Sequence, residues 1–248
     1  MKYFISYMLP LTAVLAIVFF QACKKDEPSI QTSDIKIAFE NVASGQPIEY
    51  GKLLYENVFG NRYSINTLKY YVSHITLETA DGQQYALNNY DLINQDDLEN
   101  AEIQAGSIPH GRYVSMKFNV GIDSIRNHSG DQAGDLDPSF GMVWSWTTGY
   151  IFYRHEGNYI NSLGDTTQLF FHLGTDPAMA EVSVPLNGLD IDGATEKVVI
   201  RLDLNELYRD IDFEENGVEH SSTEIKDAGW IVLMREGLRR SFSFDRVE

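Results

Sequence analysis

Cysteine is nearly absent from this chain of 248 residues, because Cys23 is the only one. One thiol cannot form a disulfide within the chain, and it cannot by itself build a thiolate metal site. Cys23 also lies at the end of an apolar N-terminal segment, before the part of the chain that is expected to fold. The sequence therefore excludes a disulfide framework, a cysteine-based metal centre and a cysteine nucleophile in the folded domain.

Basic residues are scarce as well. Lys and Arg total 19 against 36 Asp and Glu, which gives a formal net charge of −17. Proteins that bind nucleic acids generally do so by neutralising phosphates with Lys and Arg, and this chain has the opposite balance. We therefore expect no nucleic-acid partner, and the surplus carboxylates favour either cationic partners or simple solubility.

Common catalytic motifs are missing from the sequence. It contains no GxSxG elbow, no HExxH, no P-loop and no GxGxxG after a strand. His155 and Glu156 begin like a zinc-protease helix, but Tyr159 stands where the second histidine is required. We therefore expect a protein that is not an enzyme.

The one long apolar stretch is at the N-terminus, from Tyr3 to Phe20 after the charged Lys2, and it is typical of a secretion signal. The residues up to Cys23 resemble a bacterial lipobox. We expect residues 1–22 to be a lipoprotein signal peptide, Cys23 to carry the lipid, and residues 23–33 to be a flexible stalk. The protein would then be lipid-anchored in the outer membrane, facing the periplasm or the cell surface, with no other membrane contact.

Residues 34–248 are expected to form one domain rich in strands. Apolar residues alternate with polar ones at 114–120 and 198–204, and similar patterns occur near 35–39, 63–77, 150–155, 168–173 and 181–184. Helical patterns are limited to 91–101 and 222–237. The sequence predicts an all-β fold, either a β-sandwich or jelly-roll-like, with one or two short helices and a long ordered loop at 122–148. Loops of that length are often functional.

Histidine is the most plausible metal-binding residue type. Among the six histidines, His74 and His172 stand out because each lies inside an apolar strand pattern. A neutral imidazole suits copper or zinc. The methionines after residue 22 form no run, which disfavours a thioether site for Cu(I).

The aromatic block at 142–152 is the most unusual local feature. Trp144 and Trp146 are two residues apart, so in an extended chain they point to the same side. Three interpretations stay open: the end of a core strand, a platform on which sugars stack, or a redox-active or modified tryptophan.

These features occur in one recognisable pattern. It comprises Val120–Ser124, Arg126, Asn127, Ser129, Gly130, Gln132, Gly134, Leu136–Pro138, Gly141, Met142, Trp144, Trp146, Gly149, Tyr150, Phe152, Glu156 and Gly157, together with Lys69–Ser73 and Phe171–Gly174. With these residues, the chain after about residue 34 resembles the MbnP-type copper-binding protein family, in a branch common among Bacteroidetes-like lipoproteins.

The resemblance implies a secreted, β-rich protein that binds copper for capture or handling. It also implies a diheme MauG-like peroxidase partner that oxidises one tryptophan to kynurenine, for which Trp144 and Trp146 are both candidates. The ligand candidates that follow are His172 and then His74, with His155 and His220 behind them. The alternative function is a surface glycan-binding or substrate-capture lipoprotein, in which Trp144, Trp146, Tyr150 and Tyr153 would supply the stacking surface.

Overall fold

The structure is a computed structural model that describes residues 30–94, 101–145, 148–216, 220–221 and 228–248. The expected signal peptide, Cys23 and Trp146 lie outside these residues. The first strand begins at Thr32, which pairs with Pro109, so the folded part starts slightly before the expected boundary at residue 34. None of the described helices is long and apolar enough to span a membrane.

Two sheets account for the described strands. The first sheet has the order β16-β14-β1-β2, with β8 also paired to β1. In this sheet β1 and β14 run parallel, whereas the other pairs are antiparallel. Its strands are β1 (Thr32–Ala43), β2 (Gln46–Pro47), β8 (Glu102–Pro109), β14 (Lys197–Asp203) and β16 (Phe242–Val247).

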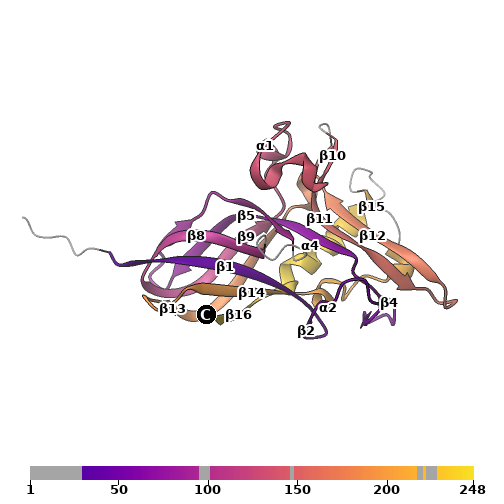
Figure 1. Cartoon of the computed structure of the whole chain (residues 1–248), viewed down its shortest axis with the longest axis horizontal. Coiled ribbons are helices and arrows are strands. Elements are labelled where there is room, and N and C mark those ends of the chain that lie inside the picture. The colour runs from indigo at the N-terminus through magenta and orange to yellow at the C-terminus, as the bar shows by residue number, and fades with distance from the viewer. Residues whose placement is uncertain (1–29, 95–100, 146–147, 217–219, 222–227) are drawn as a thin grey trace, which may run out of the picture. The chain divides into compact units, whose positions relative to one another are not determined.

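The second sheet is larger and has the order β13-β9-β5-β11-β12-β15 (Figure 1). Strands β4 and β10 also pair with β11, β3 pairs with β4, and β6 and β7 pair with β5. Its strands are β3 (Tyr55–Glu56), β4 (Arg62–Tyr63), β5 (Thr67–Thr79), β6 (Gln84–Ala86), β7 (Tyr90–Asn94), β9 (Gly111–Val120), β10 (Val143–Ser145), β11 (Gly149–Ile160), β12 (Thr166–Gly174), β13 (Ala180–Ile191) and β15 (His220–Ser221).

Every segment that was predicted to be a strand from its period-two pattern contains one. In β9, Met116, Phe118 and Val120 are buried, whereas Lys117 and Asn119 between them are only half-buried. Successive side chains of a strand point to opposite faces, so this alternation gives the sheet one face toward the core. The expected all-β class is confirmed.

The two sheets pack face to face through aromatic side chains. The ring of Phe39 in β1 lies 5.5 Å from that of Phe118 in β9 and 6.4 Å from that of Tyr70 in β5. Phe242 in β16 lies 5.1 Å from Phe118, and these pairs meet edge to face. Contacts of this kind between two sheets are typical of a β-sandwich.

Three helices come after β14 in the chain. Their side chains cover the inner face of β12. The helices are α2 (Leu204–Leu207), α3 (Phe213–Asn216) and α4 (Ala228–Ser241). The Phe171 ring of β12 contacts Tyr208, Phe213 and Trp230 at centroid distances between 5.4 and 5.8 Å. This second aromatic cluster is continuous with the core between the sheets.

The prediction of the helices was partly wrong. The described part of the chain has four α-helices rather than one or two, although α1, α2 and α3 are single turns. The expected helix at 91–101 is instead strand β7 as far as Asn94, because Leu92 and Ile93 are both buried and pair with β5. The expected helix at 222–237 corresponds to α4, which continues to Ser241.

The long segment 122–148 is ordered where the structure describes it. It contains α1 (Ser124–Asn127), two short 3-10 helices, η2 (Gly134–Leu136) and η3 (Pro138–Phe140), and then β10; a further 3-10 helix, η4 (Asp176–Ala178), follows β12. The hydroxyl of Tyr150 donates to the Leu136 carbonyl at 2.7 Å, and that of Tyr71 donates to the Asp135 carbonyl at 3.0 Å. These bonds hold the loop against the second sheet.

Candidate functional site

The outer face of the β11–β12 hairpin carries the first candidate ligand. Burial alternates along β11 from Tyr153 onward and along the middle of β12, so Arg154 and Glu156 of β11 and His172 of β12 project from the face opposite the core. Arg154 lies directly opposite His172 in the antiparallel register, and Lys69 of β5 lies on the other side of Arg154. We refer to Lys69, Trp144, Arg154, Glu156 and His172 as the outer-face cluster.

His172 is held by a carboxylate. Its Nε2 atom lies 2.8 Å from Oε1 of Glu156, and the same oxygen accepts from Arg154 Nε at 2.9 Å and Nη2 at 2.8 Å. All three side chains are between 21% and 26% exposed, so the group is accessible from solvent but partly shielded by the protein. Water therefore screens these charges less than it would on an open surface.

The charge states follow from this arrangement. Burial lowers the pKa of His172 below its usual 6.5, although Glu156 acts in the opposite direction. Burial raises the pKa of Glu156, but the hydrogen bond from His172 and the charge of Arg154 outweigh it, so that this pKa is lowered overall. Both directions fit a neutral imidazole whose Nε2–H donates to an ionised carboxylate. This tautomer leaves the lone pair on Nδ1 of His172.

Trp144 lies beside this group. A Cβ built on Gly174 would be 2.7 Å from Cζ3 of Trp144, so the indole packs directly on the glycine backbone. Gly174 is two residues after His172 in β12, and therefore the indole and the imidazole share one face of the strand. Trp144 is half-buried there.

Two cations connect the cluster to the segment that precedes Trp144. Arg154 Nη1 donates to the carbonyl of Gly141 at 2.7 Å, and Lys69 Nζ donates to that of Phe140 at 3.4 Å. Gly141 has a φ of 72°, which favours glycine. Arg154 therefore joins the carboxylate that orients His172 to the turn that positions Trp144.

His155 is on the opposite face of β11, in the core. It is fully buried, with Nδ1 2.6 Å from the hydroxyl of Tyr208 and Nε2 3.2 Å from the carbonyl of Ser64. A carbonyl can only accept, so Nε2 carries the proton and Nδ1 accepts from Tyr208. Both nitrogens are thus engaged. Gly157 makes this possible, because a Cβ there would be 1.9 Å from the Ser64 carbonyl oxygen.

His74 lies elsewhere on the second sheet. It is five residues, or roughly 17 Å along β5, from Lys69, the residue in register with Arg154 and His172. His74 Nε2 is 3.1 Å from the hydroxyl of Tyr90, which donates to Asp123, and it has an unusual positive φ of 54°. Its Nδ1 is buried without a hydrogen-bond partner among the described residues. The structure therefore does not bring His74 and His172 together.

The remaining candidates are described only in part. The backbone of His220 pairs with Phe171, beside His172, but its side chain is outside what the structure describes, as are Trp146 and Cys23. Within the described residues, no three His, Cys, Asp or Glu side chains are grouped so that they could hold a metal ion. The donors that converge on the outer-face cluster are thus one imidazole and one carboxylate.

The stacking surface of the alternative function is not formed as expected. Tyr150 and Tyr153 are 1% and 0% exposed, and Tyr153 bonds to Tyr208 inside the core. A stacking role for these two residues would require their rings to be exposed. The β11 strand is buried over its first residues on both sides, since the loop 122–148 covers its outer face there. Of the four aromatic residues, only Trp144 is described as partly accessible.

Sequence reasoning missed Arg154 and Glu156 as partners of His172. The turn Asn161–Asp165 could have predicted these partners. In a hairpin centred on this turn, residues at equal distances before and after it lie opposite each other. Ile160 pairs with Thr166, and the same register places Arg154 opposite His172. Turn geometry fixes register in hairpins.

A family model, MbnP, matches residues 32–225 of this chain. Among solved structures, the chain is similar to MbnP from Methylosinus trichosporium, with 20% sequence identity and a TM-score of 0.55 over 78% of this chain and 82% of that one. At this identity the likeness shows the fold alone. A comparison with curated proteins gave no match.

Proposed function

The chain belongs to the MbnP family, and on this premise we propose that it is a lipid-anchored extracytoplasmic protein that binds copper in order to capture or handle it. Membership of the family supports a copper-related role. The lipid anchor on Cys23 and the location at the outer membrane rest on the N-terminal sequence. Copper is then the cargo of the protein, and we propose no catalytic turnover.

The observation that carries the proposal is the state of His172. A neutral imidazole that donates one N–H to a carboxylate keeps its other nitrogen as a more basic ligand in a fixed orientation. Glu156 provides this carboxylate at 2.8 Å. His155, by contrast, uses both nitrogens inside the core, so we leave it out of the proposed ligand set. We propose His172 Nδ1 as the first copper ligand.

The site needs donors in addition to His172, and a modified tryptophan would provide them. Opening the indole ring to kynurenine creates an aromatic amine and a ketone, neither of which tryptophan possesses. We propose Trp144 as the modified residue, because its ring packs on Gly174 beside His172. A diheme MauG-like peroxidase is the proposed partner for the oxidation. His220, whose backbone lies next to β12, would provide a further ligand.

Copper binding is tested directly by loading the purified mature protein and measuring bound copper by elemental analysis. His172→Ala is expected to weaken the copper affinity at least about tenfold, because one good ligand is lost, and so to retain less copper than wild type after unbound metal is removed. His74→Ala is the matched control, since it removes an imidazole from the same sheet but outside the cluster. The proposal is rejected if wild type retains no more copper than an unrelated acidic protein, or if the two variants lose copper equally.

Tryptophan modification is tested separately. Protein produced together with its partner peroxidase is expected to show a changed intact mass and less indole absorbance, and peptide mapping is expected to place the change at Trp144. Trp144→Phe should abolish the mass change and reduce copper binding. An unmodified Trp144 in protein that still binds copper tightly would rule out this part of the proposal.

A further inference from the structure

A pocket lies at the edge of the first sheet, away from the outer-face cluster of the second sheet. Strand β8 pairs with β1 as far as Ala38, which is opposite Glu102, and β2 pairs with β1 again at Val42, opposite Pro47. The pocket is between these two pairings and has a volume of about 430 Å³. Ligand pockets for small molecules commonly start at about 300 Å³.

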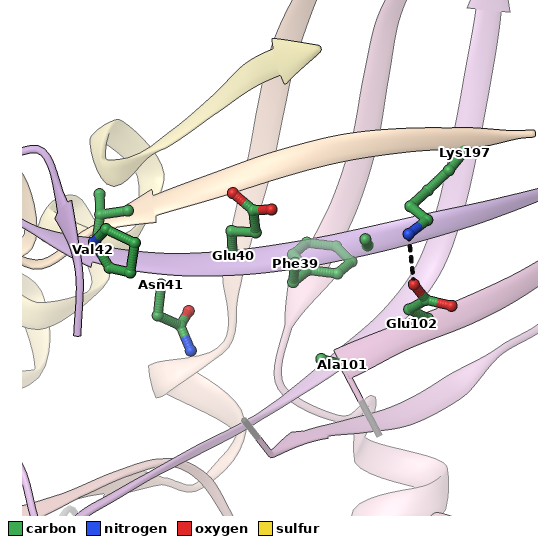
Figure 2. A pocket seen from close by; sticks show the side chains of 9 residues that line it. Phe39, Glu40, Asn41, Val42, Ala101, Glu102 and Lys197 are labelled. Carbon is green, nitrogen blue, oxygen red and sulfur yellow. Dashed lines mark ion pairs between the residues drawn. The ribbon is translucent and has the colours of Figure 1, made fainter. Parts of the chain in front are cut away.

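The walls of the pocket are mostly apolar. Ala38, Phe39, Val42, Pro47 and Ala101 line it, and Glu40, Asn41, Glu102 and Lys197 complete the lining. Figure 2 shows the Asn41 side chain leaving β1 on the side of Ala101 and Glu102, with its amide nitrogen turned away from the strand. Asn41 belongs to the same alternating set of β1 residues as Phe39, so its side chain is on the side of the strand that faces the second sheet.

Asn41 is the polar group that points to a ligand. It is 1% exposed, and its Oδ1 accepts a hydrogen bond from the hydroxyl of Tyr70 at 2.8 Å. Its Nδ2 has no hydrogen-bond partner in the part of the chain that the structure describes. A buried donor without an acceptor is rare and costly, so an oxygen supplied by a bound molecule would satisfy it.

The charges at the pocket are already paired. Glu102 accepts from Lys36 and Lys197 at 2.8 Å each, and the second of these pairs is the dashed line in Figure 2. Glu40 pairs with Arg246 at 2.6 Å. A charged ligand would gain no free counter-ion here and would lose its hydration. The pocket therefore favours a neutral ligand.

The unpaired stretch of β1 at the pocket is too short for a peptide to bind there as an added strand. Only residues 39–41 of β1 lie between the last pair with β8 and the first pair with β2. Typical strands pair over five or six residues, so the ends of β8 and β2 would block an added strand. A small molecule fits this space.

We propose that the pocket binds a small, neutral molecule with an apolar body and a carbonyl oxygen that accepts a hydrogen bond from Nδ2 of Asn41. The apolar body packs against Phe39, Val42 and Pro47. This binding activity is independent of copper, because neither Asn41 nor any lining residue belongs to the outer-face cluster.

The test uses the metal-free protein labelled with ¹⁵N and follows the side-chain amide resonances of Asn41. Acetophenone is the probe, α-methylstyrene is the same shape without the carbonyl oxygen, and benzoate is the charged comparison. Acetophenone is expected to shift the Asn41 amide protons downfield and to bind about fivefold or more tightly than either comparison.

Two variants test the pocket independently. Asn41→Asp keeps an oxygen for Tyr70 but removes the donor, so it should abolish the preference for acetophenone. Ala38→Leu leaves Asn41 unchanged and fills the mouth, so it should weaken all binding. The proposal is overturned if saturating acetophenone leaves the Asn41 amide resonances unmoved, or if Ala38→Leu binds acetophenone as tightly as wild type does. It is also overturned if the Asn41 side-chain amide protons exchange only with a bound water molecule.

Discussion

The indole of Trp144 occupies the space in which a side chain at residue 174 would begin. A Cβ at Gly174 would lie 2.7 Å from Cζ3 of the indole and 2.5 Å from the carbonyl oxygen of Tyr150. Neither contact is possible for real atoms. The absence of a side chain at this position is therefore what allows the indole of Trp144 to pack on the backbone of β12, two residues from His172.

Gly174→Ala is expected to displace Trp144. The backbone oxygen of Tyr150 cannot move easily, so the variant should also lose about 1–3 kcal/mol of stability through overpacking. The indole N–H resonance of Trp144 and urea denaturation measure the two effects. Gly111→Ala is the control, because its Cβ would meet its nearest neighbour at 3.9 Å. An unmoved Trp144 resonance in Gly174→Ala would contradict the packing of the indole on Gly174.

Replacing Arg154 by Gln is expected to tighten copper binding about tenfold, or about 1.4 kcal/mol. The guanidinium shares Oε1 of Glu156 with His172, and its positive charge repels a cation placed at the imidazole. Arg154→Lys keeps the charge and should stay close to wild type. Competition with a coloured copper chelator gives the affinities. Weaker binding by Arg154→Gln would mean that its contact with Gly141 matters more than its charge.

Stability is expected to fall as the pH drops from about 6.5 to 4. Burial lowers the pKa of His155 to about 4, whereas an unfolded histidine titrates near 6.5. In this window the unfolded state binds a proton that the folded state excludes, and the stability present above pH 6.5 is lost by up to about 3 kcal/mol. Urea denaturation at several pH values tests this. His155→Gln should remove this part of the slope, and an equal slope in both proteins would assign it to other groups.

Asn127→Ala is expected to loosen the start of β11. The side chain is 2% exposed, accepts from the Tyr150 amide at 2.8 Å and donates to Asp176 at 2.9 Å. Its loss leaves a buried amide unpaired, which costs about 2 kcal/mol. Hydrogen exchange of Tyr150 should accelerate. Gln132, which is half-buried and contacts the hydroxyl rather than the amide of Tyr150, provides the control Gln132→Ala, for which protection of that amide should be nearly unchanged.

The strands could be predicted because burial on one face of a sheet imposes period two on the sequence. Met116, Phe118 and Val120 show this in β9. The prediction was wrong at 91–94, where Leu92 and Ile93 are adjacent and both buried. Two neighbouring apolar residues do not show the period-two alternation of a strand. Pairing with β5 decided their conformation, and this pairing cannot be recognised from the local sequence.

The candidate site could be predicted only in part. His172 and Trp144 were chosen for their residue types and their positions, and the structure places them on one face of β12. His155 and His172 look similar in sequence, since both lie in apolar strands. They differ because a strand turns successive side chains to opposite faces, which puts one imidazole in the core beside Tyr208 and the other at the surface beside Glu156.

The amino-acid sequence by itself determined the all-β class and most strand positions, because alternation and turn residues act over a few neighbouring positions. It also excluded disulfides and thiolate metal sites, since composition alone decides these. Only the tertiary structure decided which histidines have a free nitrogen and which donors meet. Those properties depend on strand register and on contacts such as that between Arg154 and Gly141, which join residues distant in the chain.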